Sequence, residues 1–325
     1  MAATGWDWRK IALGAVALAG VFGIGLFAGR ELTRSREAPN TPTFRYDLQP
    51  FAEASSELLR YRLLREIPLE LRQPRGIAAG HDGRLYVCGD RVLLVLDRNG
   101  DVVQRRELEG EPTCVAAGGD GTIYVGMQDH LEVLDPAGGI RSWPDLGEQA
   151  IVTSIAVTAG GVFVADAGNR AVLRFDTGGM LVGRVGADFR IPSPYFDVAS
   201  GPDGTLWVAD TGRQTLRHYT AEGRLLGAWG KASLDIDAFG GCCNPAHVAV
   251  LPCGSLVTSE KGLLRVKVYE PDGKMTAVVA LPKDFSSRET SLDLATRKAN
   301  GGEILVLVPG QRVVRVYCRK AAADE

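Results

Sequence analysis

The 325-residue sequence predicts an all-β fold, a six-bladed β-propeller with four-stranded antiparallel blades, preceded by one N-terminal transmembrane helix. Three observations predict it. A glycine-containing turn recurs six times, short apolar strands flank every one of these turns, and one uncharged apolar segment stands apart near the N-terminus. Repeats of about 40–50 residues that each hold four short strands are typical of propeller blades.

The first predicted element is the apolar segment 11–28, which contains no charged residue, side-chain amide or proline. Its 18 residues approach the ~20 that a helix needs to cross a bilayer. A cleaved signal peptide is the alternative, but Leu26 occupies the −3 position relative to Ala28, where cleavage sites carry a small residue. We therefore expect residues 11–29 to form a signal-anchor helix that is retained after a short flank, 1–10.

Basic residues lie on both sides of this segment, so the positive-inside rule does not orient it. A large domain that follows an N-terminal anchor is most often exported. We therefore expect a single-pass protein of the cell (inner) membrane with its propeller on the periplasmic, extracytoplasmic side. The polar stretch 30–57 is interpreted as a stalk, 58–320 as the propeller and 321–325 as a tail.

The composition excludes some classes of protein. A net charge of −2 provides no basic excess, so no nucleic-acid partner is expected. The six cysteines contain no CxxC pair and follow no regular framework, which excludes a zinc ribbon and a disulfide scaffold. The remaining partners are the membrane and a protein or small-molecule ligand.

The repeats are counted from the glycines that end their turns. These glycines are 38, 40, 43, 50 and 48 residues apart: Gly83, Gly121, Gly161, Gly204, Gly254 and Gly302. A strand precedes each turn, a second follows it, and a third follows the next loop. Five units then turn again into a fourth strand, whereas the sixth reaches Cys318 without one. The stretch 59–69 can supply that strand by pairing with 313–317, which would leave no bare sheet edge.

Units three and four, VFVADAGNRAVLRFDTGG and LWVADTGRQTLRHYTAEG, resemble the NHL repeat. The residues that match the loop of that family are Asp166, Gly168, Asn169 and Arg170 in unit three, and Asp210, Gly212 and Arg213 in unit four. The resemblance covers 60–318 and implies the propeller fold. It implies no single function, because NHL propellers include ligand-binding modules, protein- and RNA-binding platforms, lyases and lactonases. We expect Asp166 and Asp210 to accept hydrogen bonds within their own loops.

Unit five departs from the other repeats in two loops. In a propeller, the loop that enters the innermost strand and the loop between the second and third strands share the face around the central channel. In unit five these loops read GCCNPAHV and TSEKG, which resemble those of exported bacterial NHL-repeat proteins. They predict a ligand- or partner-binding site on the channel face, made of Cys242, Cys243, His247, Glu260 and Lys261.

Four interpretations of the adjacent cysteines remain open. With His247 they could bind a soft metal, zinc or copper, because thiolate and imidazole suit these ions. They could form a redox pair. One thiolate, its pKa lowered by Lys261, could be a nucleophile. Cysteine also packs as a small apolar residue beneath turns, with no further role.

Alignment of the innermost strands gives a second candidate site. The first residues of the six strands are Gly76, Cys114, Ser154, Asp197, His247 and Asp293. Around the channel mouth, Cys114, Asp197, His247 and Asp293 would supply a mixed-ligand metal site. The alternative is that the Asp and Ser side chains only cap their strands by hydrogen bonds. In NHL-related amidating lyases a metal-binding histidine follows the proline directly, but here Ala246 does, which departs from the lyase pattern.

Three functions follow from these patterns. The first is a membrane-anchored binding or scaffolding module with its site on the channel face around blade five, which is favoured because no acid–base pair is recognisable. The second is a redox or metal-binding accessory protein that uses Cys242, Cys243 and His247. The third is a channel-site lyase or hydrolase.

Overall fold

The computed structural model describes residues 51–286 and 289–321, and within these ranges 24 strands form six four-stranded antiparallel sheets. The predicted anchor, 11–29, lies outside the described residues. No helix in the described part of the chain is long and apolar enough to span a membrane.

The strands follow one another blade by blade. Blade one contains β2 (Pro74–Ala79), β3 (Leu85–Gly89), β4 (Val92–Leu96) and β5 (Val102–Glu107). Blade two contains β6 (Cys114–Ala117), β7 (Ile123–Gly126), β8 (Leu131–Leu134) and β9 (Ile140–Ser142). Blade three contains β10 (Val152–Thr158), β11 (Gly161–Asp166), β12 (Ala171–Phe175) and β13 (Leu181–Val185). Blade four contains β14 (Val198–Ser200), β15 (Leu206–Asp210), β16 (Thr215–Tyr219) and β17 (Leu225–Trp229). Blade five contains β18 (His247–Val250), β19 (Leu256–Ser259), β20 (Val266–Tyr269) and β21 (Met275–Ala280). Blade six contains β22 (Asp293–Arg297), β23 (Glu303–Val308), β24 (Val313–Arg319) and β1 (Tyr61–Pro68). Short 3₁₀ turns are η2 (Ser56–Leu58), η3 (Thr211–Arg213), η4 (Pro282–Asp284) and η5 (Pro309–Gln311).

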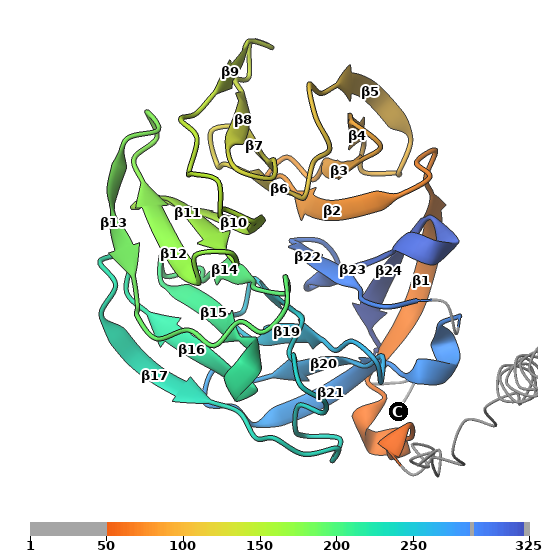
Figure 1. Ribbon diagram of the computed structural model, residues 1–325. Coiled ribbons are helices and arrows are strands. Elements are labelled where there is room, and N and C mark those ends of the chain that lie inside the picture. Colours follow the sequence, from red (N-terminus) through yellow and green to blue (C-terminus); the bar gives the residue numbers. More distant parts are fainter. Residues whose placement is uncertain (1–50, 287–288, 322–325) are drawn as a thin grey trace, which may run out of the picture. The chain divides into compact units, whose positions relative to one another are not determined.

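The six sheets radiate from a common centre, with β5, β9, β13, β17, β21 and β1 at the perimeter (Figure 1). The innermost strands β2, β6, β10, β14, β18 and β22 contact one another in a closed ring. Among the described residues, apolar clusters fill the spaces between neighbouring blades. Val87 of blade one packs in a cluster with Leu305 of blade six, and Val164 of blade three packs in a cluster with Tyr124 of blade two. The hydrophobic core is therefore a set of layers between blades.

The recurrent turns carry their glycines for a conformational reason. All six glycines have positive φ, for example +82° at Gly83 and +130° at Gly161. Residues with a Cβ seldom adopt this region, whereas glycine does so without a steric penalty. The glycine spacing therefore marked true hairpin turns, and the predicted number of blades is confirmed.

Blade six is completed by the N-terminal strand, as predicted. β1 pairs antiparallel with β24 in a register that runs from Tyr61↔Arg319 to Pro68↔Val313. Because β1 pairs with the last strand, the first and last strands of the propeller share one sheet. The ring is thus closed at its perimeter by backbone hydrogen bonds between segments more than 240 residues apart.

Candidate functional site

The six innermost strands enclose a cavity of about 190 Å³ on the propeller axis. The third residue of each aligned strand is alanine, and these line the cavity: Ala78, Ala116, Ala156, Ala199, Ala249 and Ala295. The strands approach so closely that a methyl group on Gly76 would lie 2.9 Å from the Cα of Cys114. Polar chemistry inside the channel therefore comes mainly from the first residues of the strands.

Three of these first residues reach across to the neighbouring blade. Each accepts a hydrogen bond from the backbone N–H of the second residue in the next innermost strand. The pairs are Val198 N–H to Ser154 Oγ (3.3 Å), Val248 N–H to Asp197 Oδ2 (2.6 Å) and Ile77 N–H to Asp293 Oδ2 (2.8 Å). The second carboxylate oxygen of each Asp accepts the N–H of the residue that follows it. The predicted capping interaction is therefore present, and it bridges blades.

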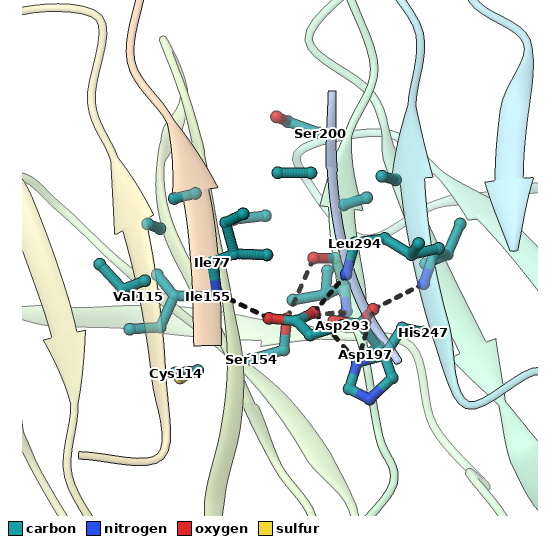
Figure 2. Close-up of a pocket in the computed structure, with 18 of the residues that line it drawn as sticks. Ile77, Cys114, Val115, Ser154, Ile155, Asp197, Ser200, His247, Asp293 and Leu294 are labelled. Atoms are coloured by element: carbon teal, nitrogen blue, oxygen red, sulfur yellow. Dashed lines mark hydrogen bonds and ion pairs between the residues drawn. The ribbon is translucent and has the colours of Figure 1, made fainter. Parts of the chain in front are cut away.

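His247 lies between the two carboxylates. Its Nδ1 is 3.3 Å from Asp293 Oδ1 and 3.6 Å from Asp197 Oδ2, and the side chain is 18% exposed. Figure 2 shows the ring below the two aspartates, with its second nitrogen turned away from them. No described residue hydrogen-bonds to that nitrogen, Nε2. His247 thus has one nitrogen held by the two aspartates and one, Nε2, that points away from them and has no hydrogen-bond partner among the described residues.

The charges of these three groups depend on one another. Burial lowers the pKa of His247, but its interaction with Asp197 and the charge of Asp293 outweigh this effect, so the pKa lies above its ordinary value. Burial raises the pKa of Asp293 to about 6, against the attraction of His247 and with a further rise from Asp197. Around pH 6, protonated His247 is therefore stabilised beside Asp293, which itself titrates in this range.

Tyr195 and Lys261 extend the site toward the rim. The Tyr195 ring meets the His247 ring edge-on, with centroids 6.2 Å apart at 84°. Lys261 Nζ lies 4.5 Å from the centroid of the Tyr195 ring, within the range of a cation–π interaction. Sequence reasoning missed Tyr195. The signal was an aromatic residue in the loop that enters β14, on the channel face.

The two adjacent cysteines contact each other. Their Sγ atoms are 3.3 Å apart, with Cys242 exposed and Cys243 buried. The sequence predicted that Cys242, Cys243 and His247 could bind zinc or copper. The described part of the chain contains no group of three or more His, Cys, Asp or Glu side chains that could hold a metal ion. The Nδ1 of His247 is instead engaged by aspartates.

The mixed-ligand metal site predicted around the channel mouth is likewise not formed. Asp197, His247 and Asp293 come together, but the Asp oxygens already accept backbone N–H groups. Cys114 is buried, its Sγ accepts a hydrogen bond from the Thr113 hydroxyl at 3.7 Å, and burial raises the pKa of its thiol to about 12. Without a metal, the raised pKa keeps this thiol protonated.

The prediction that Glu260 lies with the thiols on the exposed channel face is wrong. Its side chain is fully buried, and Oε2 accepts the Gly240 N–H at 3.0 Å. Arg265 Nη2 donates to Oε2 at 2.7 Å, and Lys267 Nζ lies 2.6 Å from Oε1. Two buried cations hold the carboxylate inside the blade, so Glu260 is structural. The alternating Arg265 and Lys267 in a third strand were the sequence signal for this cluster.

Glu260 corresponds to two aspartates of the preceding blades. Asp166 accepts the Ile151 N–H at 3.0 Å, and Asp210 accepts the Arg190 N–H at 2.8 Å. Each carboxylate ties the loop after the second strand to the loop that enters the blade. Asp166 also accepts the N–H of Asn169 in its own loop, as predicted.

No known protein family matches the sequence, and no curated protein matches it. Solved structures match the fold. A streptogramin B lyase aligns with a TM-score of 0.59 at 13% identity, covering 82% of this chain and 100% of that chain. A catalytically inactive histidine-to-alanine variant of virginiamycin B lyase from Staphylococcus aureus, with quinupristin, gives 0.57 at 12% identity, covering 80% and 100%. Selenomethionine-substituted virginiamycin B lyase from the same organism gives 0.54 at 13%, covering 81% and 90%. At these identities the likeness shows the propeller fold alone.

Proposed function

We propose that the chain is an exported, membrane-anchored propeller of NHL type that binds a ligand on its channel face, beside blade five. The proposed anchor is 11–29, which the sequence favours because it is apolar throughout. The proposed ligand carries a carboxylate or phosphate end group.

The observation that carries this proposal is the orientation of His247. Its Nδ1 is fixed by two carboxylates that are themselves hydrogen-bonded to backbone, while Nε2 points away from them (Figure 2) and has no partner among the described residues. Protonation of His247 makes Nε2 a charged donor, and Lys261, whose Nζ lies 4.5 Å from the centroid of the Tyr195 ring that meets His247, adds a second cation. A hydrogen-bond acceptor that carries negative charge fits this pair of donors.

The size of the cavity limits what can enter. At about 190 Å³ it is smaller than the roughly 300–1,000 Å³ of pockets that enclose whole drug-sized ligands. An end group fits within the channel, and the remainder of a larger ligand would then rest on the surrounding loops, where Tyr195 offers an aromatic surface.

Thermal denaturation of the full chain with simple probes tests the proposal. Acetate or inorganic phosphate should raise the Tm of the wild type by mass action, more at pH 6 than at pH 9, relative to chloride at equal ionic strength. His247→Ala should abolish the rise. His130→Ala is the matched control, because His130 also contacts an aspartate, Asp129, in a loop of blade two. An equal rise in His247→Ala, or a rise with ethylammonium alone, would contradict the proposal.

A lyase is the second candidate, and one observation favours it. A histidine with Nδ1 held by a carboxylate and Nε2 free has the arrangement of a general base. Structural neighbours are lyases, one of them inactivated by replacement of a histidine. We rank ligand binding above lyase activity because a lyase would also need a general acid beside His247. Asp197 and Asp293 already accept backbone hydrogen bonds and are not free for that role. Linearisation of quinupristin by the wild type but not by His247→Ala would reverse this order.

A further inference from the structure

The turn that carries the two adjacent thiols is fixed on both sides. Gly240 N–H donates to the buried Glu260 carboxylate at 3.0 Å, and the Asn244 side-chain amide donates to the Gly240 carbonyl at 2.6 Å. Between these fixed points the Sγ atoms of Cys242 and Cys243 lie 3.3 Å apart. The two sulfurs are therefore held in contact by the turn itself.

The same turn is joined to the Lys261 loop. The Asn244 amide donates to the Lys261 carbonyl at 3.1 Å, and the Lys261 N–H donates to Asn244 Oδ1 at 2.8 Å. The neighbouring Cys243 raises the pKa of Cys242, and the charge of Lys261 partly opposes that rise. The exposed thiol thus has a second thiol on one side and a cation within electrostatic range.

We propose that Cys242 and Cys243 form a reversible vicinal disulfide by exchange with an external disulfide, RSSR. The Cys242 thiolate attacks one sulfur of RSSR, the RS–SR bond breaks, and RS⁻ leaves. The Cys243 thiolate then attacks the Cys242 sulfur of the mixed disulfide and expels the second RS⁻. The two cysteines lose two electrons and two protons, and RSSR gains both as two RSH. Reduction reverses these steps.

The order of attack follows from exposure. Cys242 is exposed and meets the external disulfide, whereas Cys243 is buried and acts as the resolving thiol. The other cysteines lack this arrangement. Cys88, Cys114 and Cys318 are buried, and the exposed Cys253 donates to the Ser255 hydroxyl at 3.3 Å. The proposal does not depend on the proposed ligand site, because exchange requires only the two thiols and a disulfide.

Peptide mass analysis of the full chain tests this directly. Reduced protein is equilibrated with oxidised and reduced glutathione at stepped ratios, quenched with acid and alkylated with N-ethylmaleimide. As the buffer becomes more oxidising, the peptide that contains Cys242 and Cys243 should escape alkylation and weigh about 2 Da less than the unmodified dithiol peptide; after treatment with dithiothreitol it should take up two maleimide groups. The rate should rise with pH, because the thiolate is the attacking species.

Two variants separate this outcome from unspecific oxidation. Cys243→Ser should trap Cys242 as a mixed disulfide with glutathione, and Cys253→Ser should leave the Cys242–Cys243 reaction unchanged. Circular dichroism checks that both variants fold. The proposal is overturned if wild-type Cys242 accumulates as the glutathione adduct, or if both thiols remain alkylatable at every ratio.

Discussion

At the scale of single residues, the aspartates beside His247 have two tasks. Asp197 ties blade four to blade five, and Asp293 ties blade six to blade one, while both also hold the imidazole. The site is therefore built from the same bonds that hold the innermost strands together. A change at either aspartate should affect stability and histidine chemistry at once.

Asp293→Asn tests this coupling. Asn offers one acceptor oxygen where Asp293 accepts two N–H groups, so one buried N–H loses its partner at a cost of about 1–3 kcal/mol in unfolding free energy. Folded Asp293 and His247 both bind protons more tightly than their ordinary pKa values imply. Their contribution to stability is therefore present at acid pH and is lost as pH rises through about 6.

The stability difference between wild type and Asp293→Asn should accordingly be largest near pH 4 and narrow above pH 6, as measured by urea denaturation. Asp272→Asn is the matched control, since Asp272 accepts the Lys274 N–H in an exposed turn. A difference that widens with rising pH would show that the pKa of Asp293 is not raised.

Sequence alignment of the innermost strands identified Asp197, His247 and Asp293 as neighbours because repeats place equivalent residues in a ring. The alignment could not reveal that the carboxylate oxygens of Asp197 and Asp293 already accept hydrogen bonds from backbone N–H groups. Those hydrogen bonds cross from one blade to the next. They depend on how far neighbouring blades are shifted along the channel axis, which side-chain packing between the blades determines. For the same reason, the presence of an aromatic residue in the loop that enters β14 did not by itself reveal that Tyr195 reaches His247 from another blade.

At the scale of elements, the third strands of four blades repeat a buried or half-buried cation over an aromatic ring. In blade three, Arg174 lies 5.9 Å from the Phe163 centroid. Arg217 lies 5.3 Å from the Phe189 centroid, Lys267 lies 5.0 Å from that of Phe239, and Arg315 lies 5.4 Å from that of Phe285. Blade five adds Arg265 and pairs both cations with Glu260. This polar interior stabilises the loop that carries the thiols.

Glu260→Gln should lower the unfolding free energy by about 3–5 kcal/mol at pH 7, because it leaves buried Arg265 and Lys267 without their counter-charge. Burial already lowers the pKa of Lys267 to about 8, and the loss of Glu260 lowers it further. Folded Lys267 of the variant then sheds its proton at lower pH than in the wild type, so the deficit should shrink as pH rises to about 8, above which Lys267 is neutral in both folded proteins. The control variant Glu222→Gln, at an exposed site, should have the same unfolding free energy as the wild type. If Glu260→Gln also leaves the unfolding free energy unchanged, the Glu260 carboxylate does not stabilise the cluster.

The strand pattern of blade five was predictable, but the direction of Glu260 was not. TSEKG lies in a loop of the channel face, and loops usually expose their charges. Glu260 has one methylene more than Asp210, which holds the equivalent position in blade four, and its side chain reaches inward to Arg265. The charges of a neighbouring strand, more than the loop itself, decided where it points.

At the scale of the whole molecule, the repeat spacing predicted six blades and the closing strand because glycine turns and apolar strands are local features. The proposed membrane attachment rests on sequence alone. Alkaline phosphatase fused after Glu325 should be active when the full chain is expressed, and deletion of 1–29 should abolish that activity and move the protein to the soluble fraction. An inactive fusion of the full chain would overturn export, and a mature protein that starts near Gly29 would overturn anchoring.

The closing strand has a mechanical consequence for the proposed membrane tether. The chain that precedes Tyr61 enters the propeller through β1, whose ladder with β24 also seals the ring. Tension on the tether is therefore borne first by the hydrogen bonds that keep the propeller closed. Seven paired positions and the Arg315–Glu66 ion pair share that load. Under the proposed anchoring, a pull on the chain before Tyr61 therefore acts on the outer edge of blade six, the strand of that blade farthest from the channel.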